Sequence, residues 1–147
     1  VGSEMCIRDR VQLISKGAGH TPGDLVLYLP DEGMLFTGDL VFNDCHPYVP
    51  HGNIKKWMGW LDDMDSLEVN RVMPGHGELG SGELITEMKN YLLDLQGLAR
   101  ELYEKKPSDL SMDSITIPDK YKEWWFDRFY NANLQFAYQS LNEDSVE

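Results

Sequence analysis

The segment Gly17–Phe42 constrains the fold more than any other part of the chain, because it has the pattern of a tight hairpin with a metal-ligand residue type at each end. Its apolar run Asp24–Pro30 predicts a mostly buried strand, and Asp31–Gly33 has the composition of a turn in which glycine adopts a positive φ. A hairpin requires neither His20 before it nor Asp39 after it, whereas imidazole and carboxylate are common metal ligands. The segment therefore predicts β structure built beside a metal site.

The remaining chain alternates between strand and helix patterns, which indicates an α/β protein with helices on one face of a mixed sheet. The expected strands, about four or five in total, include Val11–Ser15, Leu25–Leu29, Met34–Thr37 (ended by Gly38) and Arg71–Met73. The expected helices are Ile54–Leu67 capped by Asn53, a long helix from Leu84 to before Pro107, and the tail segments Ser108–Ile115 and Lys120–Asn142.

Three short motifs each place one metal-ligand residue type after an apolar run and beside glycine. They are "HTPG" with His20, "TGD" with Asp39 and "PGHG" with His76. Glycine lets backbone segments and side chains approach a common point closely. Two imidazoles and one carboxylate suit Zn²⁺ and are acceptable to iron or manganese. The motifs therefore predict one shared metal site.

In this order, the three motifs resemble the C-terminal half of the metallo-β-lactamase-fold hydrolase family, from Val11 to about Gln96. The resemblance implies half of an αββα sandwich followed by a helical C-terminal extension. It also implies two zinc ions in the complete site, with His20 on the first, Asp39 bridging both as the catalytic carboxylate, and His76 on the second. Ligands about 2.1 Å from one zinc lie at most about 4.2 Å apart, so the three side chains should converge, Asp39 and His76 most closely.

The family's main metal motif, His-x-His-x-Asp-His, belongs upstream of the "HTPG" segment and does not occur in this sequence. We therefore expect a truncated chain. Residues 1–10, which resemble a sequencing-adapter remnant, should be a non-native leader, residues 11–106 a partial metallo-β-lactamase-fold domain and residues 107–147 the helical extension. Such a piece should leave an apolar sheet face exposed, bind metal weakly and be inactive alone.

Other residues are weaker candidates for function. In the loop Phe42–Asn53, we consider His46 and Tyr48 as candidates for lining a substrate pocket, the alternative being a solvated loop with incidental side chains. The adjacent Trp124 and Trp125 are expected to attach the tail to the core.

The resemblance implies that the parent protein is a metal-dependent hydrolase of a small ester, thioester or amide. The best-known zinc subclass of true β-lactamases has a cysteine at the position of Asp39, which makes a β-lactamase the less favoured member. The alternative from another class is a non-catalytic binding or scaffolding module. A formal net charge of −12, from 13 Lys and Arg against 25 Asp and Glu, disfavours nucleic acid and anionic membrane as partners. Oligomeric state and localisation stay open.

Overall fold

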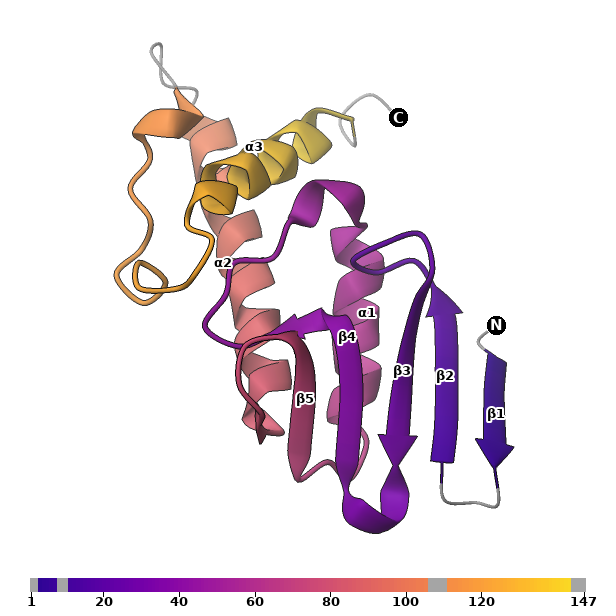
Figure 1. Cartoon of the computed structure of the whole chain (residues 1–147). Coiled ribbons are helices and arrows are strands. Elements are labelled where there is room, and N and C mark those ends of the chain that lie inside the picture. The colour runs from indigo at the N-terminus through magenta and orange to yellow at the C-terminus, as the bar shows by residue number, and fades with distance from the viewer. Residues whose placement is uncertain (1–2, 8–10, 106–110, 144–147) are drawn as a thin grey trace.

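The computed structural model describes residues 3–7, 11–105 and 111–143. Within these ranges, six strands form one sheet in the order β1-β2-β3-β4-β5-β6, and α1 and α2 lie behind it in the view of Figure 1. The strands are β1 (Ser3–Ile7), β2 (Val11–Gly17), β3 (Asp24–Leu29), β4 (Met34–Phe42), β5 (Arg71–His76) and β6 (Gly80–Ser81). The helices are α1 (Ile54–Asp65), α2 (Glu83–Lys105) and α3 (Arg128–Glu143), with 3₁₀ turns η1 (Pro30–Glu32), η2 (Val49–His51) and η3 (Met112–Ser114).

The sheet is mixed, as the sequence predicts. The pairs β1–β2, β2–β3 and β3–β4 are antiparallel, whereas the pair β4–β5 is parallel. A parallel pair needs a crossover connection, which α1 supplies. The ends of β4 and β5 therefore lie side by side, and Gly38 and Phe42 pair with Pro74 and His76.

The core lies between the sheet and the helices. Asn53 caps α1 as predicted, since its side chain accepts a hydrogen bond from the backbone N–H of Lys56 at 2.9 Å. The indole Nε1 of Trp57 donates to the carbonyl of Leu40 at 2.8 Å and joins α1 to β4. Fully buried core side chains from the sheet and from the helices include Leu35, Leu40, Trp57, Leu61, Met88, Tyr91, Leu92 and Leu134.

Two strand predictions are wrong in an informative way. Gly38 does not end its strand: with φ at 52° it takes up a register shift, and β4 continues through Asp39 to Phe42. A bulge re-aims side chains without ending a strand. Ser3–Ile7, for which no strand was expected, pair antiparallel with β2, because an unpaired strand edge accepts any extended backbone.

The C-terminal region differs from the prediction in where its helices lie. Helix α3 begins at Arg128 rather than Lys120, because the preceding segment makes backbone hydrogen bonds to the loop after β4: the Trp125 N–H donates to the Asp44 carbonyl and the His46 N–H to the Trp125 carbonyl, each at 2.8 Å. The expected helix Ser108–Ile115 is the short turn η3 where it is described, and its first residues lie outside the described ranges. No helix in the described part of the chain is long and apolar enough to cross a bilayer.

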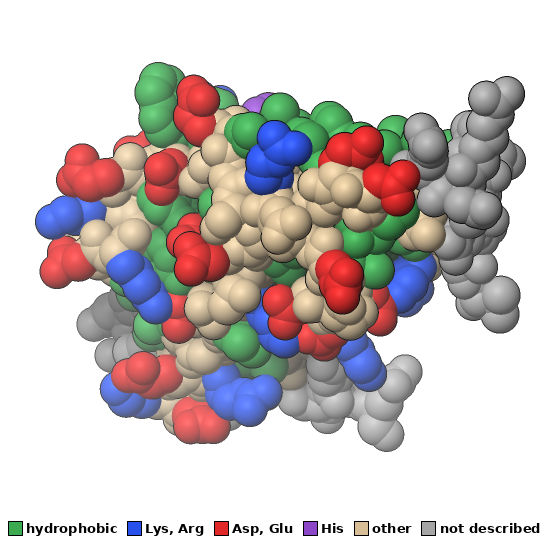
Figure 2. All heavy atoms as spheres, turned by 90° about the horizontal axis from the view of Figure 1, so that it is seen from below, with side chains coloured by type: hydrophobic (Ala, Val, Ile, Leu, Met, Phe, Trp, Pro, Cys, Tyr) green, Lys and Arg blue, Asp and Glu red, His purple; other side chains and the backbone are tan. Residues whose placement is uncertain are grey.

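The sheet face opposite the helices is apolar, as predicted. Cross-strand pairing places Leu13, Leu27, Phe36 and Met73 in one row on this face. Leu25 is 53% exposed and Phe36 is 37% exposed, and no described segment covers them. This face is turned toward the viewer in Figure 1 and lies along the upper margin of Figure 2, where hydrophobic side chains gather. Single exposed apolar residues are ordinary, but a row across four strands marks a contact surface.

Candidate metal centre

The fold brings the three predicted residues to one end of the central strands. His20 lies in the loop between β2 and β3, Asp39 in β4, and His76 at the last position of β5. His76 Nε2 is 3.6 Å from Asp39 Oδ1, and His20 Nδ1 is 4.0 Å from Asp39 Oδ2. The two oxygens of one carboxylate therefore face two different imidazoles. Both separations are compatible with paired ligands of one ion.

His20 is held in place by apolar neighbours. Its side chain is largely buried, and the Trp57 ring meets it edge-on with centroids 5.1 Å apart. Desolvation lowers the pKa of His20, although the charges of Asp39 and Asp24 and a backbone contact with Tyr48 oppose that effect. Among the described residues, no atom forms a hydrogen bond with its buried Nδ1. A neutral imidazole with an unpartnered buried nitrogen is suited to metal ligation.

The positions of His76 and Asp39 in the centre depend on ring stacking and on a glycine in β5. His76 stacks on Phe42, with ring centroids 5.3 Å apart and planes 11° from parallel, so the imidazole orientation is fixed. A Cβ atom at Gly75 would lie 2.1 Å from Asp39 Oδ1 and 2.7 Å from the Gly38 carbonyl carbon. Only glycine at position 75 lets β5 approach Asp39 this closely.

The donor set is nitrogen and oxygen, which fits zinc and also iron or manganese. In the ranges that the structure describes, no group of three or more His, Cys, Asp or Glu side chains could hold a metal ion. The arrangement is instead two histidine–aspartate pairs that share the Asp39 carboxylate. Additional ligands would be needed to complete either metal site.

The expectation that His46 faces a substrate is wrong for this structure, because its side chain is only 1% exposed. His46 Nε2 lies 3.0 Å from the Tyr121 carbonyl, and Nδ1 lies 3.1 Å from the Tyr91 hydroxyl. A carbonyl can only accept, so the proton of the neutral imidazole is on Nε2 and the Tyr91 hydroxyl donates to Nδ1. His46 thus joins the loop after β4 to α2 and the C-terminal extension.

This burial predicts a pH-dependent stability. Desolvation lowers the pKa of His46, with smaller opposing contributions from the Tyr121 carbonyl and Asp127. In the unfolded chain the imidazole has a pKa of about 6.5, so the unfolded state binds the proton first as pH falls. The contribution of His46 to stability is therefore complete above about pH 6.5 and decreases below it, by at most about 1.4 kcal/mol per pH unit.

Urea unfolding of the protein at pH 7.5 and pH 5.5 measures this decrease. The His46→Gln variant should lose less stability between the two pH values than the unsubstituted protein does, and His20, also buried, accounts for part of the remainder. An equal loss in both proteins would contradict the prediction.

Tyr48, the second candidate for the substrate pocket, is half-buried beside the centre. Its ring contacts His51 and Phe129 edge-on, with centroid distances of 4.8 and 5.3 Å. A contact between Tyr48 and substrate stays a prediction. Asp24, expected to make local hydrogen bonds, accepts from the N–H and hydroxyl of Thr21 at 3.1 and 2.8 Å.

The sequence did not indicate the aromatic residues beside His76. Trp124 packs against Tyr91, with ring centroids 5.4 Å apart, and attaches the tail as expected. Trp125, predicted to do the same, is 72% exposed and lines a hollow of ≈ 340 Å³ with Phe126 and His76. The backbone here forms turns and a single bridge to Cys45 instead of the expected helix, and the two neighbouring tryptophans differ in their exposure.

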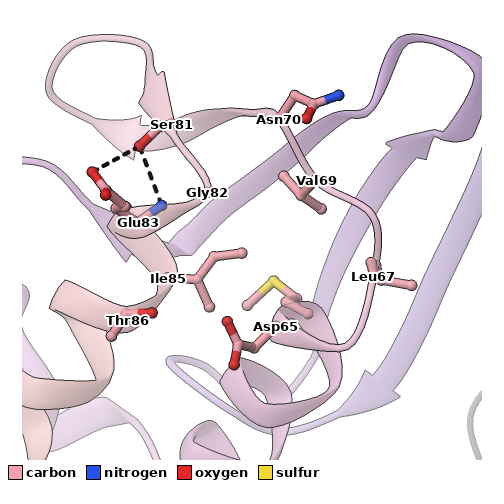
Figure 3. A pocket seen from close by; sticks show the side chains of 10 residues that line it. Asp65, Leu67, Val69, Asn70, Ser81, Gly82, Glu83, Ile85 and Thr86 are labelled. Atoms are coloured by element: carbon pink, nitrogen blue, oxygen red, sulfur yellow. Dashed lines mark hydrogen bonds between the residues drawn. The ribbon is translucent and has the colours of Figure 1, made fainter.

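A second hollow, of ≈ 510 Å³, lies away from the metal centre (Figure 3). It is lined from the C-terminal end of α1 and the start of α2, and includes Asn70, just before β5, whereas His76 is at the other end of that strand. Its polar groups include Asp65 and Glu83, the latter bonded to Ser81. No histidine lines it among the described residues.

Comparison with known proteins agrees with the fold and with the order of the motifs. The family model of the metallo-beta-lactamase superfamily matches residues 7–76. Acyl-coenzyme A thioesterase MBLAC2 from Bos taurus and from Homo sapiens are each 27% identical to this chain over 97 residues, which is 62% of this chain and 35% of the relative. The chain thus spans about a third of the length of these relatives.

Solved structures of metallo-beta-lactamases are also similar to this chain over part of their length. The chain is similar to VMB-1, with 29% identity and a TM-score of 0.57, over 64% of this chain and 46% of that one. It is similar to DIM-1 metallo-beta-lactamase, with 27% identity and a TM-score of 0.57, over 63% and 46% of the two chains. The aligned region is less than half of each solved chain.

Proposed function

We propose that this chain is part of a metal-dependent hydrolase of the metallo-beta-lactamase superfamily, whose family model matches residues 7–76, with a centre that includes His20, Asp39 and His76. The observation that carries the proposal is the shared carboxylate: Asp39 presents one oxygen to each histidine, at 3.6 and 4.0 Å. The unpartnered, buried Nδ1 of His20 supports it, because that nitrogen lacks any other partner among the described residues.

The proposed metals are two zinc ions, with iron or manganese as alternatives, held in the complete protein by these residues and by ligands outside this chain. When bound, such ions supply Lewis acidity, which activates water and polarises a carbonyl oxygen. The residues of this chain would hold the ions and orient the ligand side chains. Asp39 is the proposed bridging carboxylate, the burial of His20 keeps its imidazole neutral, and stacking on Phe42 orients His76.

The proposed substrate is a small thioester, ester or amide. A thioester is favoured because MBLAC2 of Homo sapiens, which shares 27% identity with this chain, is an acyl-coenzyme A thioesterase. The aspartate at position 39 makes a β-lactam the less favoured substrate. Because the chain spans only 35% of that relative, the activity is proposed for the complete protein.

Metal removal tests the proposal. The complete protein should hydrolyse a short acyl thioester, lose that activity in a strong chelator and regain it when zinc is added back. The chain of 147 residues alone should bind zinc weakly and show no turnover of thioester, ester or β-lactam, since it supplies too few ligands to close either site.

Two results would contradict the proposal. Activity of the complete protein that survives full removal of metal would exclude the centre from the reaction. Nanomolar zinc binding with turnover by the isolated chain would mean that the catalytic site lies elsewhere. A complete protein that binds zinc but hydrolyses none of these compounds would favour the alternative, a non-catalytic binding module.

A further inference from the structure

An exposed pair of aromatic side chains from the C-terminal extension lies next to the metal centre. Trp125 is 72% exposed and Phe126 is 38% exposed. Both line the hollow of ≈ 340 Å³ that also contains His76, and the Phe126 ring meets the His76 ring edge-on with centroids 6.1 Å apart. A large apolar group left in water at a site of catalysis indicates a contact surface.

The backbone of this segment is fixed, so the exposure does not reflect a loose tail. Trp125 forms a parallel bridge with Cys45 and exchanges backbone hydrogen bonds with Asp44 and His46 at 2.8 Å. Phe126 has a φ of 64°, which is uncommon for an aromatic residue and turns the chain sharply before α3. None of these backbone bonds requires the indole of Trp125, which leaves that side chain available for a ligand.

The charges around the hollow favour an uncharged ligand group. Asp44 and Glu78 line it, and Asp127 follows directly on the exposed surface. Arg128 is the nearby cation, and its guanidinium carbon lies 5.9 Å from the Phe126 ring centroid and 5.0 Å from that of Phe129. Its guanidinium thus makes cation–π contacts with both rings. An anionic group would be repelled by the carboxylates that line the hollow.

We propose that Trp125 and Phe126 form a subsite for the apolar acyl group of the substrate, so that the C-terminal extension determines which acyl chain length is accepted. This inference rests on the proposed hydrolase function and deepens it by naming the substrate class. Burial of one methylene group changes affinity about fourfold, so a few methylenes against the indole alter selectivity strongly.

Ester hydrolysis by the metal-loaded complete protein tests the subsite, with p-nitrophenyl acetate and p-nitrophenyl octanoate as probes. Trp125→Ala should lower kcat/KM for the octanoate by about tenfold and for the acetate by less than twofold. Trp125→Phe should retain most of the octanoate activity. Leu93→Ala, which removes a side chain 47% exposed on α2, is the matched control and should leave both rates unchanged.

Binding of octanamide, an uncharged probe, gives a readout independent of turnover. It should protect tryptophan fluorescence from acrylamide quenching, and Trp125→Phe should abolish most of that protection. Equal loss of acetate and octanoate hydrolysis in Trp125→Ala, or unchanged selectivity, would overturn the subsite. If the complete protein hydrolyses neither ester, the hydrolase proposal fails, and octanamide protection then decides the subsite. Protection that depends on Trp125 upholds the subsite, and an absence of protection overturns it.

Discussion

Replacing Asp39 with alanine is expected to abolish hydrolysis in the complete protein, by a factor of about 10³ or more, and to lower its zinc content. The reason is geometric: the Asp39 carboxylate faces both histidines, so its loss removes the proposed bridging ligand and leaves His20 and His76 without a shared partner. Loss of a metal ligand reduces both affinity and the chemistry that the ion supplies. Metal analysis and thioester hydrolysis measure the two effects together.

A matched control separates this effect from a general loss of carboxylate charge. Asp113 is exposed in η3, and Asp113→Ala should leave metal content and rate within about twofold of the unsubstituted protein. Asp39→Asn keeps the shape of the side chain and removes its charge, so it should behave like Asp39→Ala. An Asp39→Ala protein with normal zinc content and rate would exclude Asp39 from the centre.

The second large effect is expected at Asn133, on α3. Its side chain is fully buried and makes three hydrogen bonds: its Oδ1 accepts from the Val49 N–H at 2.9 Å, and its Nδ2 contacts the Pro47 carbonyl at 2.7 Å and the Tyr91 hydroxyl at 3.1 Å. Asn133→Ala leaves a backbone donor and a backbone acceptor buried without partners. Each such group costs about 1–3 kcal/mol, so stability should fall by about 2–6 kcal/mol.

Asn131, on the same helix, provides the control. Its Oδ1 is buried and accepts no hydrogen bond from the residues that the structure describes, so Asn131→Ala removes no such bond and should change stability little. Urea unfolding followed by tryptophan fluorescence compares the two variants. Equal midpoints for Asn131→Ala and Asn133→Ala would show that the Asn133 hydrogen bonds do not attach the extension to the loop after β4.

Local chemistry in the sequence was sufficient to predict much of the fold and the convergence of His20, Asp39 and His76. The hairpin around Gly33, whose φ is 57°, follows from the turn residues Asp31–Gly33, and α1 follows from its Asn53 cap and apolar stripe. Each motif lies directly after an apolar run, and the ends of adjacent strands meet at one edge of a sheet. His20, Asp39 and His76 could therefore be assigned to one place before any coordinates.

Positions set by contacts between distant segments could not be predicted. Lys120–Asp127 has a helix-compatible composition, but it folds into turns whose backbone bonds to Asp44 and His46 in the loop after β4. The same contacts bury His46, which the sequence offered as a candidate for the substrate pocket, and Trp125, expected to attach the tail to the core, is exposed.

The division follows from the range of the interactions. The sequence by itself determined the candidate ligand residues, the turn and the first helix cap, because these depend on residues a few positions apart. Only the tertiary structure decided that β4 passes through Gly38, that His46 is a buried link and that Trp125 stands beside His76. Those outcomes depend on hydrogen bonds and packing between segments up to about 80 residues apart, whose partners no local pattern specifies.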